Sequence, residues 1–414
     1  MKAVHEHAVH ATDTRSHAPP NDSGSEPAGR AVFLDSPVQT TQVLLARCIR
    51  TAHQATRAAP PAPTDWDQLV RAACDGWLGG LLLDAVERNG WSLPPYLLAP
   101  LRRQATRIHH NNARIMGRLS AVAAALERNG VAVLLLKGAG LNLTVYDNFG
   151  LRAMSDLDLL VRINAAPRAM AVLEALGFRR GPALLREDFF PRFHYEVEYV
   201  SGGPRAVRID LHVRPFRPLR FAQTVSNDVF WRSSREIEVD AATVYVPGDS
   251  EQFVHLATHS ACHGHSRLVW LYDICRLVDL CGPRLNWDQI LRTSRDCGLT
   301  AAVRDAVDNV EKKFGPVIPD AARAQLNRAK SSWRDRLCIV QARHDVRHPL
   351  RHVVVNLFCM VGLRTRLSYL LAVIFPGAGH IGQIYSRRHP GWLMVGHAKR
   401  WIRAAVGPVH NALL

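Results

Sequence analysis

Two aspartates separated by one residue are the side chains of this chain best suited to metal chemistry. Asp156 and Asp158 lie in the apolar run 155–161, and side chains at positions i and i+2 of a strand point to the same face of a sheet. Neighbouring carboxylates repel each other and need a cation, and Mg²⁺ binds one or two carboxylates together with substrate phosphates. Asp210, in a second short strand-like run, supplies a third carboxylate. The pattern predicts a site for metal-dependent phosphoryl or nucleotidyl transfer.

The three carboxylates have different predicted tasks. A Mg²⁺ ion, or Mn²⁺ in its place, on Asp156 and Asp158 would neutralise charge on a leaving pyrophosphate. Asp210 would bind a second ion or accept a proton from the attacking hydroxyl. The alternative is a strand end with solvated acids, because an Asp-x-Asp motif alone is unspecific. The third acid and a glycine turn upstream favour the functional interpretation.

A lysine and a glycine follow the short apolar run 131–136. A glycine turn after a strand lets backbone N–H groups approach a phosphate, and the N-terminus of the next helix favours an anion. We expect Gly138 to contact phosphate and Lys137 to add a positive charge on the triphosphate. The alternative is an ordinary turn from strand to helix.

Two further residues are candidates for the nucleotide site. Arg152 lies four residues before Asp156 and would clamp a phosphate or pair with the acids. His212 should share a strand face with Asp210. It would orient Asp210, contact the nucleotide or help to deprotonate the acceptor, and a purely structural hydrogen bond is the alternative.

Three histidines, His255, His259 and His263, fall on one face of a predicted helix. The HxxxH spacing is compatible with zinc, but the glutamate of HExxH is absent. A wall of the active-site cleft is favoured over metal binding, with ordinary packing as the remaining alternative. In the next predicted helix, Asp273 is expected to pair locally with Arg276 or a histidine.

The elements that must position these residues follow from periodicity and turn signals. A long helix over 101–128 closes at Asn129-Gly130, and a buried strand follows over 131–136. A short helical stretch reaches Tyr146, the Asp156 strand comes next, and a helix covers 165–176. Residues 195–200 and 207–213 read as a hairpin around 201–204. Asp249 or Ser250 would cap the histidine helix, and helices are expected over 268–280 and 287–314.

Composition divides the chain into five expected regions. They are a disordered tail over 1–37, a helical N-terminal region over 38–129, a core with strands over 130–247, a helical acceptor-side domain over 248–330 and a basic helical region over 331–414. The tail is assigned to disorder because it is rich in His, Pro, Ser, Asp and Gly and poor in apolar residues.

Positive charge is concentrated at the C-terminal end. The net charge is +16, and residues 331–414 hold twelve Arg and Lys against two acids, 12 − 2 = +10. A basic surface attracts polyphosphate, nucleic acid or anionic lipid. Contact with nucleic acid through this region is therefore one expectation, and a solvated Arg-rich tail is the alternative.

Cysteine usage and hydropathy favour a cytoplasmic protein. None of the eight Cys forms a CxxC pair, so reduced thiols are expected rather than a zinc ribbon or a disulfide framework. The start of the chain lacks the apolar core of a signal peptide. No run is long enough to span a bilayer. The nearest, over 353–377, is interrupted by Arg364 and Arg366, and a buried helix is favoured there over an interfacial one.

The ordered set of motifs resembles the bacterial uncharacterised nucleotidyltransferase family of the polymerase-β-type superfamily. The motifs are Leu136-Lys137-Gly138-Ala139-Gly140, Tyr146, Leu151-Arg152-x-x-Ser155-Asp156-Leu157-Asp158-Leu159-Leu160-Val161, Asp210-Leu211-His212, His255…His259…His263 and Leu268-Val-Trp270-Leu-x-Asp273. The resemblance covers roughly residues 60 to 320.

This resemblance implies an α+β fold, with a small mixed β-sheet core of the polymerase-β type and helical regions on either side. It implies Mg²⁺-dependent transfer of NMP from an NTP such as ATP. Gly138 would be the glycine of the phosphate turn, and Asp156, Asp158 and Asp210 the metal-binding carboxylates. The superfamily usually places Ser after that glycine, whereas Ala139 stands here, so backbone amides and Lys137 must replace the hydroxyl contact.

The acceptor stays open at this stage. Related families modify RNA ends, protein hydroxyls or small molecules, and fold-level analogy does not choose among them. A toxin-type enzyme acting on RNA, an enzyme that tailors a peptide or small molecule, and a non-catalytic nucleotide-binding module are the alternatives. Three clustered acids without a metal are costly, which argues against the last.

Overall fold

The computed structural model describes residues 37–54, 56–60, 65–181, 189–240, 242–343 and 349–384, together with Met394, Gly396 and Lys399. The predicted tail lies outside the described residues except at Pro37, where the first helix begins. Part of the basic C-terminal region also lies outside them.

A seven-stranded mixed sheet carries the predicted site residues, in the order β3-β4-β5-β2-β1-β7-β6. Its strands are β1 (Leu134–Leu136), β2 (Asp156–Leu160), β3 (Arg179–Arg180), β4 (Glu196–Val200), β5 (Arg208–His212), β6 (Arg235–Val239) and β7 (Ala242–Val246). The central pair β2 and β5 runs parallel, as do β1 and β7, whereas the other neighbours are antiparallel.

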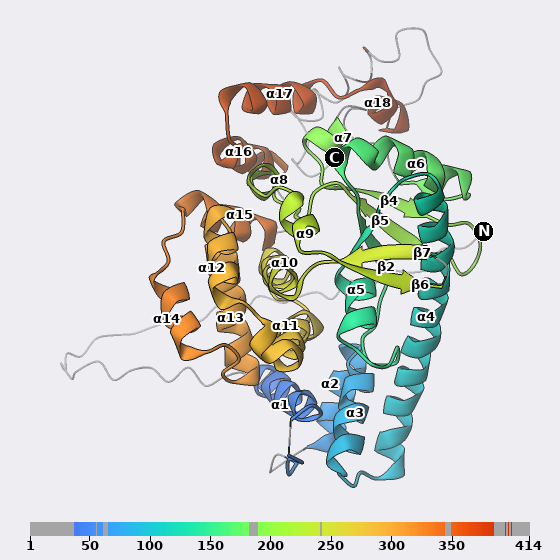
Figure 1. Ribbon diagram of the computed structural model, residues 1–414, viewed down its shortest axis with the longest axis vertical. Helices are drawn as coiled ribbons and strands as arrows, with labels where there is room; N and C mark the ends of the chain where they lie inside the picture. Colours follow the sequence, from blue (N-terminus) through green and yellow to red (C-terminus); the bar gives the residue numbers. More distant parts are fainter. Residues whose placement is uncertain are drawn as a thin grey trace, which may run out of the picture. The chain divides into compact units, whose positions relative to one another are not determined.

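The two faces of the sheet bury different side chains because strand residues alternate. Leu157, Leu159, Ile209 and Leu211 point to one face and pack with α4 and α6 in an apolar core. Leu134, Leu136 and Leu160 point to the other face and join a second core formed largely by helices. Figure 1 shows α4 along one side of the sheet and α10 and α11 on the other.

Helices before and within the sheet segment hold its edges and crossovers. They are α1 (Pro37–Thr51), α2 (Trp66–Asp75), α3 (Gly79–Asn89), α4 (Pro95–Arg128), α5 (Lys137–Thr144), α6 (Ala166–Ala175), α7 (Phe189–Arg192), α8 (Leu219–Thr224) and α9 (Asp228–Arg232), with a short 3₁₀ turn at Ile163–Ala165. The long helix α4 ends at Asn129 and Gly130, the latter with φ +66°, which confirms the predicted end.

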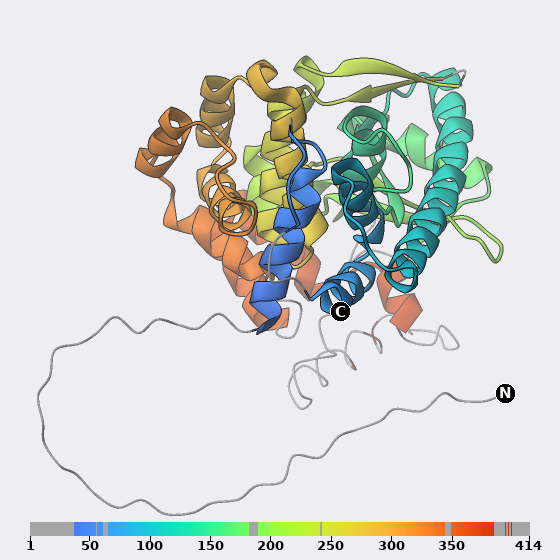
Figure 2. The ribbon, with the colours of Figure 1, turned by 90° about the horizontal axis from the view of Figure 1, so that it is seen from below.

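The second half of the chain is helical. Its helices are α10 (Asp249–Cys262), α11 (Leu268–Cys281), α12 (Trp287–Asp296), α13 (Thr300–Phe314), α14 (Asp320–Arg328), α15 (Trp333–Arg343), α16 (Pro349–Cys359), α17 (Leu363–Ile374) and α18 (Ala378–Ile384), with a 3₁₀ turn at Gly282–Arg284. Helix α1 returns from the start of the chain to pack on α11 and α13, as Figure 2 shows from below. Residues Pro37–Leu414 belong to one compact unit, and the five-region division of the chain stays a prediction.

Several local predictions are confirmed and others are wrong. The predicted hairpin forms, with Glu196 opposite His212 and Val200 opposite Arg208. The strand over 131–136 is shorter than predicted and begins only at Leu134. Residues 287–314 form two helices, because Gly298 adopts φ +72° and ends the first. The capping prediction is also wrong: Gly248 occupies the N-cap of α10 without a side-chain bond.

Sequence analysis missed the strands β3, β6 and β7. Strands β6 and β7 form a hairpin, with Arg235 opposite Val246 and Val239 opposite Ala242. Residues 235–239 and 242–246 alternate polar and apolar side chains, which was a usable signal. β7 pairs with β1 and so closes the sheet beside the predicted site.

Candidate active site

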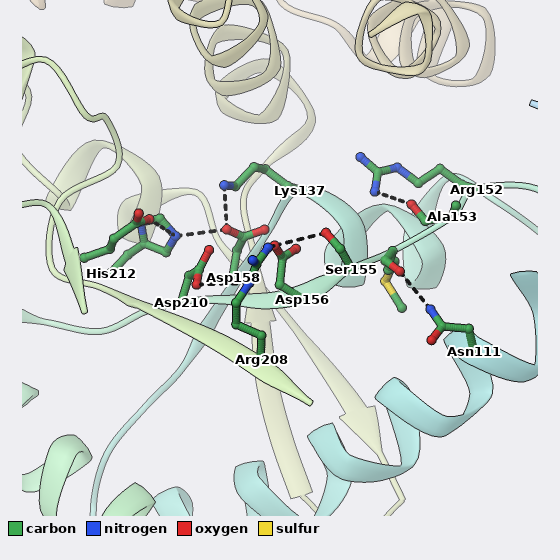
Figure 3. Close-up of polar contacts among 12 residues, drawn as sticks. Asn111, Lys137, Arg152, Ala153, Ser155, Asp156, Asp158, Arg208, Asp210 and His212 are labelled. Carbon is green, nitrogen blue, oxygen red and sulfur yellow. Dashed lines mark hydrogen bonds and ion pairs between the residues drawn. The ribbon is translucent and has the colours of Figure 1, made fainter. Parts of the chain in front are cut away.

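The register of β2 and β5 brings the predicted carboxylates together. Asp158 lies directly opposite Asp210, and Asp156 lies opposite Arg208. These side chains share the sheet face that is turned toward α10 and α11, because Leu157 and Ile209 between them enter the opposite core. Figure 3 shows the three carboxylates side by side on the two strands.

Asp158 is the central acid of the site and is only 3% exposed. Its Oδ1 atom lies 2.5 Å from Nζ of Lys137 and 3.0 Å from Nε2 of His212 (Figure 3). Burial alone would raise the pKa of Asp158, but the charge of Lys137 and the hydrogen bond from His212 hold that pKa well below its usual range. Burial acts against the charge of Lys137 as well, yet the Asp158 carboxylate raises the lysine pKa. Both groups are therefore charged at neutral pH.

Asp156 lies at the more open end of the same strand. The Arg208 guanidinium donates a hydrogen bond to its carboxylate, and the Ser155 hydroxyl lies 3.1 Å from the same oxygen. Nε of Arg208 also lies 3.8 Å from Asp210. Arg208 therefore links the outer carboxylates, while Lys137 neutralises the inner one.

Among the described residues, the closest ion pair of Asp210 is the one with Arg208, and the surroundings of this carboxyl group are acidic. Burial, followed by the negative charges of Glu196, Asp158 and Asp156, raises the pKa of Asp210 to about 7. This carboxyl group is thus poised to exchange a proton near neutral pH. The same crowding of acids is the electrostatic signature of a face that attracts a cation.

Glu196 is a site residue that sequence analysis missed. It stands opposite His212 in the hairpin, and its Oε2 atom lies 3.4 Å from Nε2 of that histidine. The predicted pairing of 195–200 with 207–213 contained this information, because a tight hairpin places Glu196 across from the end of β5. Arg208 was also given no role, although it is two residues before Asp210 and so shares its face.

Gly138 stands in the first turn of α5, directly after β1. A Cβ atom at this position would lie 2.8 Å from Nη1 of Arg152 and 3.0 Å from Met154, so a larger residue would force these two side chains to move. Lys137 itself adopts φ +47°, which turns the chain sharply from strand to helix. Ala139 is fully buried in the core behind the sheet. The residue after the glycine therefore faces away from the cleft.

Arg152 lies beside Gly138 but pairs with an acid from the helical half. Its Nη2 and Nε atoms lie 3.0 and 3.4 Å from the two oxygens of Asp273. Asp273, which is completely buried, also accepts a 2.7 Å hydrogen bond from Tyr146. The expected local pairing of Asp273 with Arg276 or a histidine is wrong, because the partner comes from the loop before β2. Of the two roles predicted for Arg152, the phosphate clamp stays a prediction, and the carboxylate with which it pairs is Asp273.

The loop that carries Arg152 is tied to α4 by asparagines. Asn112, fully buried, donates to the carbonyls of Phe149 and Arg152 at 2.9 and 2.6 Å and accepts from the amide of Met154 at 3.0 Å. Asn111 donates to the carbonyl of Met154 at 2.8 Å (Figure 3). These bonds fix the entry into β2 and hence the position of Asp156.

A cleft of about 1720 Å³ opens over the carboxylates. The charged side chains that line it are mostly basic: Arg71, Arg107, Lys137, Arg152, Arg205, Arg208, Arg217 and Arg267 against Asp75, Asp156, Asp158, Glu196 and Asp210. The formal balance is 8 − 5 = +3, which favours an anionic ligand over a neutral one. The volume is ample for a nucleotide and part of a second substrate.

The predicted histidine wall forms at this cleft. His259 and His263 line it, with Trp270 of α11 packed against both rings at 5.0 and 5.2 Å between centroids. His255 is buried behind them and stacks on Phe216. Burial and the charge of Lys137 lower the pKa of His255 to about 3 and that of His263 to about 4, so both are neutral at pH 7. They therefore present aromatic rings and hydrogen-bonding nitrogens rather than positive charge.

Metal binding by side chains alone is not evident from the geometry. Within the part of the chain that the structure describes, no three His, Cys, Asp or Glu side chains are arranged to hold one ion. In this structure the positive charges next to the carboxylates are those of Lys137, beside Asp158, and Arg208, beside Asp156. The donor set nevertheless suits Mg²⁺, which needs only one or two carboxylates when phosphate oxygens and water complete its shell.

Comparison with known proteins gives the family. Residues 62–315 match the model of an uncharacterised nucleotidyltransferase family. The chain belongs to this family. A crystal structure of an antigenic nucleotidyltransferase-like protein from Paracoccidioides brasiliensis is similar to 53% of this chain and 94% of its own, at 16% sequence identity and a TM-score of 0.33. No curated protein matches the sequence.

The family match over residues 62–315 contains the site residues named in this section and extends from α2 through α13. It shows that the chain is a nucleotidyltransferase in the general sense, and it does not identify the acceptor. The basic lining of the cleft and the paired carboxylates are the features that such a family member offers to a nucleotide.

Proposed function

We propose that this nucleotidyltransferase transfers NMP from an NTP, such as ATP, to a hydroxyl acceptor, with Asp156, Asp158 and Asp210 as the carboxylates that bind Mg²⁺ together with phosphate oxygens and water. The observation that carries the proposal is the parallel register of β2 and β5, which places Asp158 opposite Asp210 and on the same face as Asp156. The mixed sheet with carboxylates on two neighbouring strands further supports the polymerase-β type of core. A bacterial origin is part of the proposal through the resemblance of the motifs alone.

The metal would supply charge neutralisation at the triphosphate and at the leaving pyrophosphate. The three carboxylates fit it because they are oxygen donors crowded enough to raise the pKa of Asp210 to about 7. Mn²⁺ has the same preference for oxygen and would be accepted at the same residues.

The chain's own groups bind the phosphates and move the proton. Lys137 reaches the cleft from the first turn of α5 and would hold a triphosphate oxygen together with the free backbone N–H groups of that turn, including that of Gly138. Arg152, fixed by Asp273, would provide a second positive charge. Asp210 would accept the proton of the acceptor hydroxyl, because it lies opposite Asp158 and lines the cleft. His212 would keep Asp158 in place through its 3.0 Å hydrogen bond.

The acceptor would enter from the side of α10 and α11. His259, His263 and Trp270 form the wall opposite the strands that carry the acids. Neutral rings of this kind bind flat or amphipathic groups and exclude water from the reacting atoms. All eight cysteines are free, which favours a reducing compartment such as the cytoplasm for this reaction.

Incubation with each α-³²P-labelled NTP and Mg²⁺, with and without total cellular RNA, tests the proposal. Label should transfer to RNA, to protein or to a small molecule, and Asp156→Ala should reduce it by roughly 10³-fold or more with the fold intact, since one essential charge is lost. Asp228→Ala, at an exposed aspartate in an ion pair with Arg162 on the surface, is the matched control. Binding of Mg²⁺ and NTP without any transfer would establish instead the non-catalytic module.

A toxin-type RNA acceptor is distinguished in the same experiment. Label on RNA that falls steeply as salt rises would assign an RNA acceptor, because phosphate contacts release counterions. Label that resists RNase and runs with small molecules would assign tailoring of a small product. Activity that survives Asp156→Ala undiminished would refute the site itself.

A further inference from the structure

Exposed large apolar side chains are concentrated in the pair of helices α16 and α17. Val354, Phe358 and Val361 are 48, 60 and 53% exposed, and Leu363, Leu367 and Leu371 are 70, 51 and 53% exposed. We call these six residues the apolar face. The favoured expectation of a buried helix over 353–377 is therefore wrong: Gly362, with φ +85°, divides it into two helices, and each exposes part of its apolar surface.

The apolar face is ordered by the helices rather than scattered. Leu363, Leu367 and Leu371 are spaced four apart and so form one stripe along α17. Val354 and Phe358 have the same spacing on α16, and α16 packs against α17. Six exposed large apolar side chains on two neighbouring helices are uncommon on a protein surface and mark a place of interaction.

The other side of the same helices is anchored to the sheet-bearing half of the molecule. Tyr369, Ala372 and Val373 are buried and pack with Phe193 and Leu219. Arg220 of α8 pairs with Asp335 of α15 at 2.5 Å and donates to the carbonyl of Cys359 at 3.2 Å. Figure 1 shows α16 beside α8, with α17 beyond it. The helices are thus held in place, while the described residues leave the apolar face exposed.

The part of the sequence that contains the apolar face carries charge of one sign. Residues 346–414 contain nine Arg and Lys and no Asp or Glu. Arg364, one residue after Leu363, is exposed. The same segment contains Trp392 and Trp401. Leucine and tryptophan among arginines, with acids absent, is the composition that binds at an anionic membrane surface.

We propose that the apolar face of α16 and α17 docks on an anionic lipid surface. The six side chains would enter the boundary between headgroups and acyl chains, and the arginines would contact lipid phosphates. The helices would lie in the interface, because α17 has 12 residues and reaches about 18 Å, well short of the ~30 Å hydrocarbon core. Among the described residues, no helix is long and apolar enough to cross a bilayer.

A lipid surface explains the charge better than a second copy does. Two copies meeting through this face would bring the exposed Arg364 of each copy toward the other, with no acid in 346–414 to oppose it. Anionic headgroups oppose this charge.

Flotation of the full-length protein with vesicles tests the proposal. We expect binding to vesicles of phosphatidylcholine with phosphatidylserine, weaker binding as salt rises, and little binding to phosphatidylcholine alone. Leu363→Glu should weaken binding about tenfold or more. The variant loses the transfer of one leucine side chain from water into the lipid, and it adds a negative charge that anionic headgroups repel. Tyr96→Glu is the control. It changes a side chain on α4 that is 64% exposed and does not belong to the apolar face, so it should leave binding unchanged.

Three outcomes would overturn the proposal. The first is no binding to anionic vesicles at low salt, which would mean that the chain covers the apolar face itself. The second is equal binding by Leu363→Glu and the unmodified protein. The third is a dimer, measured by light scattering, that Leu363→Glu converts to a monomer while vesicles do not bind. Because none of these readouts involves NTP, failure here leaves the proposed nucleotidyl transfer untouched.

Discussion

The carboxylate face of β2 and β5 and the apolar face of α16 and α17 depart in opposite ways from the usual distribution of side chains. Asp158 and His212 are ionisable and almost wholly buried, at 3 and 1% exposure, whereas Leu363 is apolar and 70% exposed. Both arrangements cost free energy in a protein alone in water. Such costs are typical of binding surfaces. The chemistry of the carboxylate face suits Mg²⁺ with a nucleotide, and that of the apolar face suits lipid.

The two regions differ in where their compensation lies. In the first, the buried charges are matched within the chain: Lys137 and His212 both contact Asp158. In the second, no described side chain covers the apolar face. Removing one side chain from the carboxylate face therefore leaves a buried charge without a partner. Removing one side chain from the apolar face leaves no charge unpaired. The predictions below test this difference.

Within the carboxylate face, the largest effect on stability should come from Lys137→Met. The substitution leaves the buried Asp158 carboxylate with His212 as its remaining close partner, and breaking a buried ion pair of this kind costs about 3–5 kcal/mol of unfolding free energy. Urea unfolding of the metal-free protein measures it. The double variant with Asp158→Asn should recover much of the loss, because no charge is left unpaired. A single variant as stable as the unmodified protein would show that the pair is not matched within the chain.

Much of the first region could be predicted from sequence because its signals are local. Asp156 and Asp158 are two residues apart, and the period of a strand alone places them on one face. The prediction of Asp210 required only that residues 207–213 form a strand. Nothing in the local sequence showed that this strand would be the parallel neighbour of β2. The structure places it there, opposite Asp158.

What was missed depends on contacts between distant segments. Arg152 and Asp273 are 121 residues apart, and the choice of partner for Asp273 was decided by packing of α11 against the loop before β2. Sequence analysis offered only local partners for Asp273, namely Arg276 or a histidine. The exposure of the apolar face was predicted wrongly for the same reason. The sequence pattern of an apolar helix is the same whether or not another segment covers it.

A smaller effect should come from Asp210→Asn in the metal-free protein. The folded-state pKa of Asp210 is about 7, against about 3.9 in the unfolded chain. The folded state therefore keeps a proton that the unfolded state loses between these values, and the unmodified protein loses stability as pH rises through that window. The variant cannot ionise and should be more stable above pH 7, by roughly 1–3 kcal/mol, with no advantage below about pH 4.

Urea unfolding from pH 4 to 8 measures this difference. Asp296→Asn is the control, since Asp296 is 74% exposed and should show no such dependence. An advantage of Asp210→Asn that is the same at every pH would contradict the account, because it would then arise from packing and not from ionisation.

The smallest effect in water should come from Leu367→Ala, and it sharpens the comparison most directly. Leu367 is 51% exposed on α17, and because no described side chain covers this exposed part, its removal should change the unfolding free energy by about 0.5 kcal/mol or less. The same substitution at Leu271, which is fully buried in α11, should cost about 2–5 kcal/mol. Anionic vesicles should then stabilise the unmodified protein more than Leu367→Ala, because a ligand that binds only the folded state adds stability in proportion to its affinity. A loss at Leu367 as large as that at Leu271 in the absence of lipid would mean that the apolar face is covered within the protein, and the two regions would no longer differ in kind.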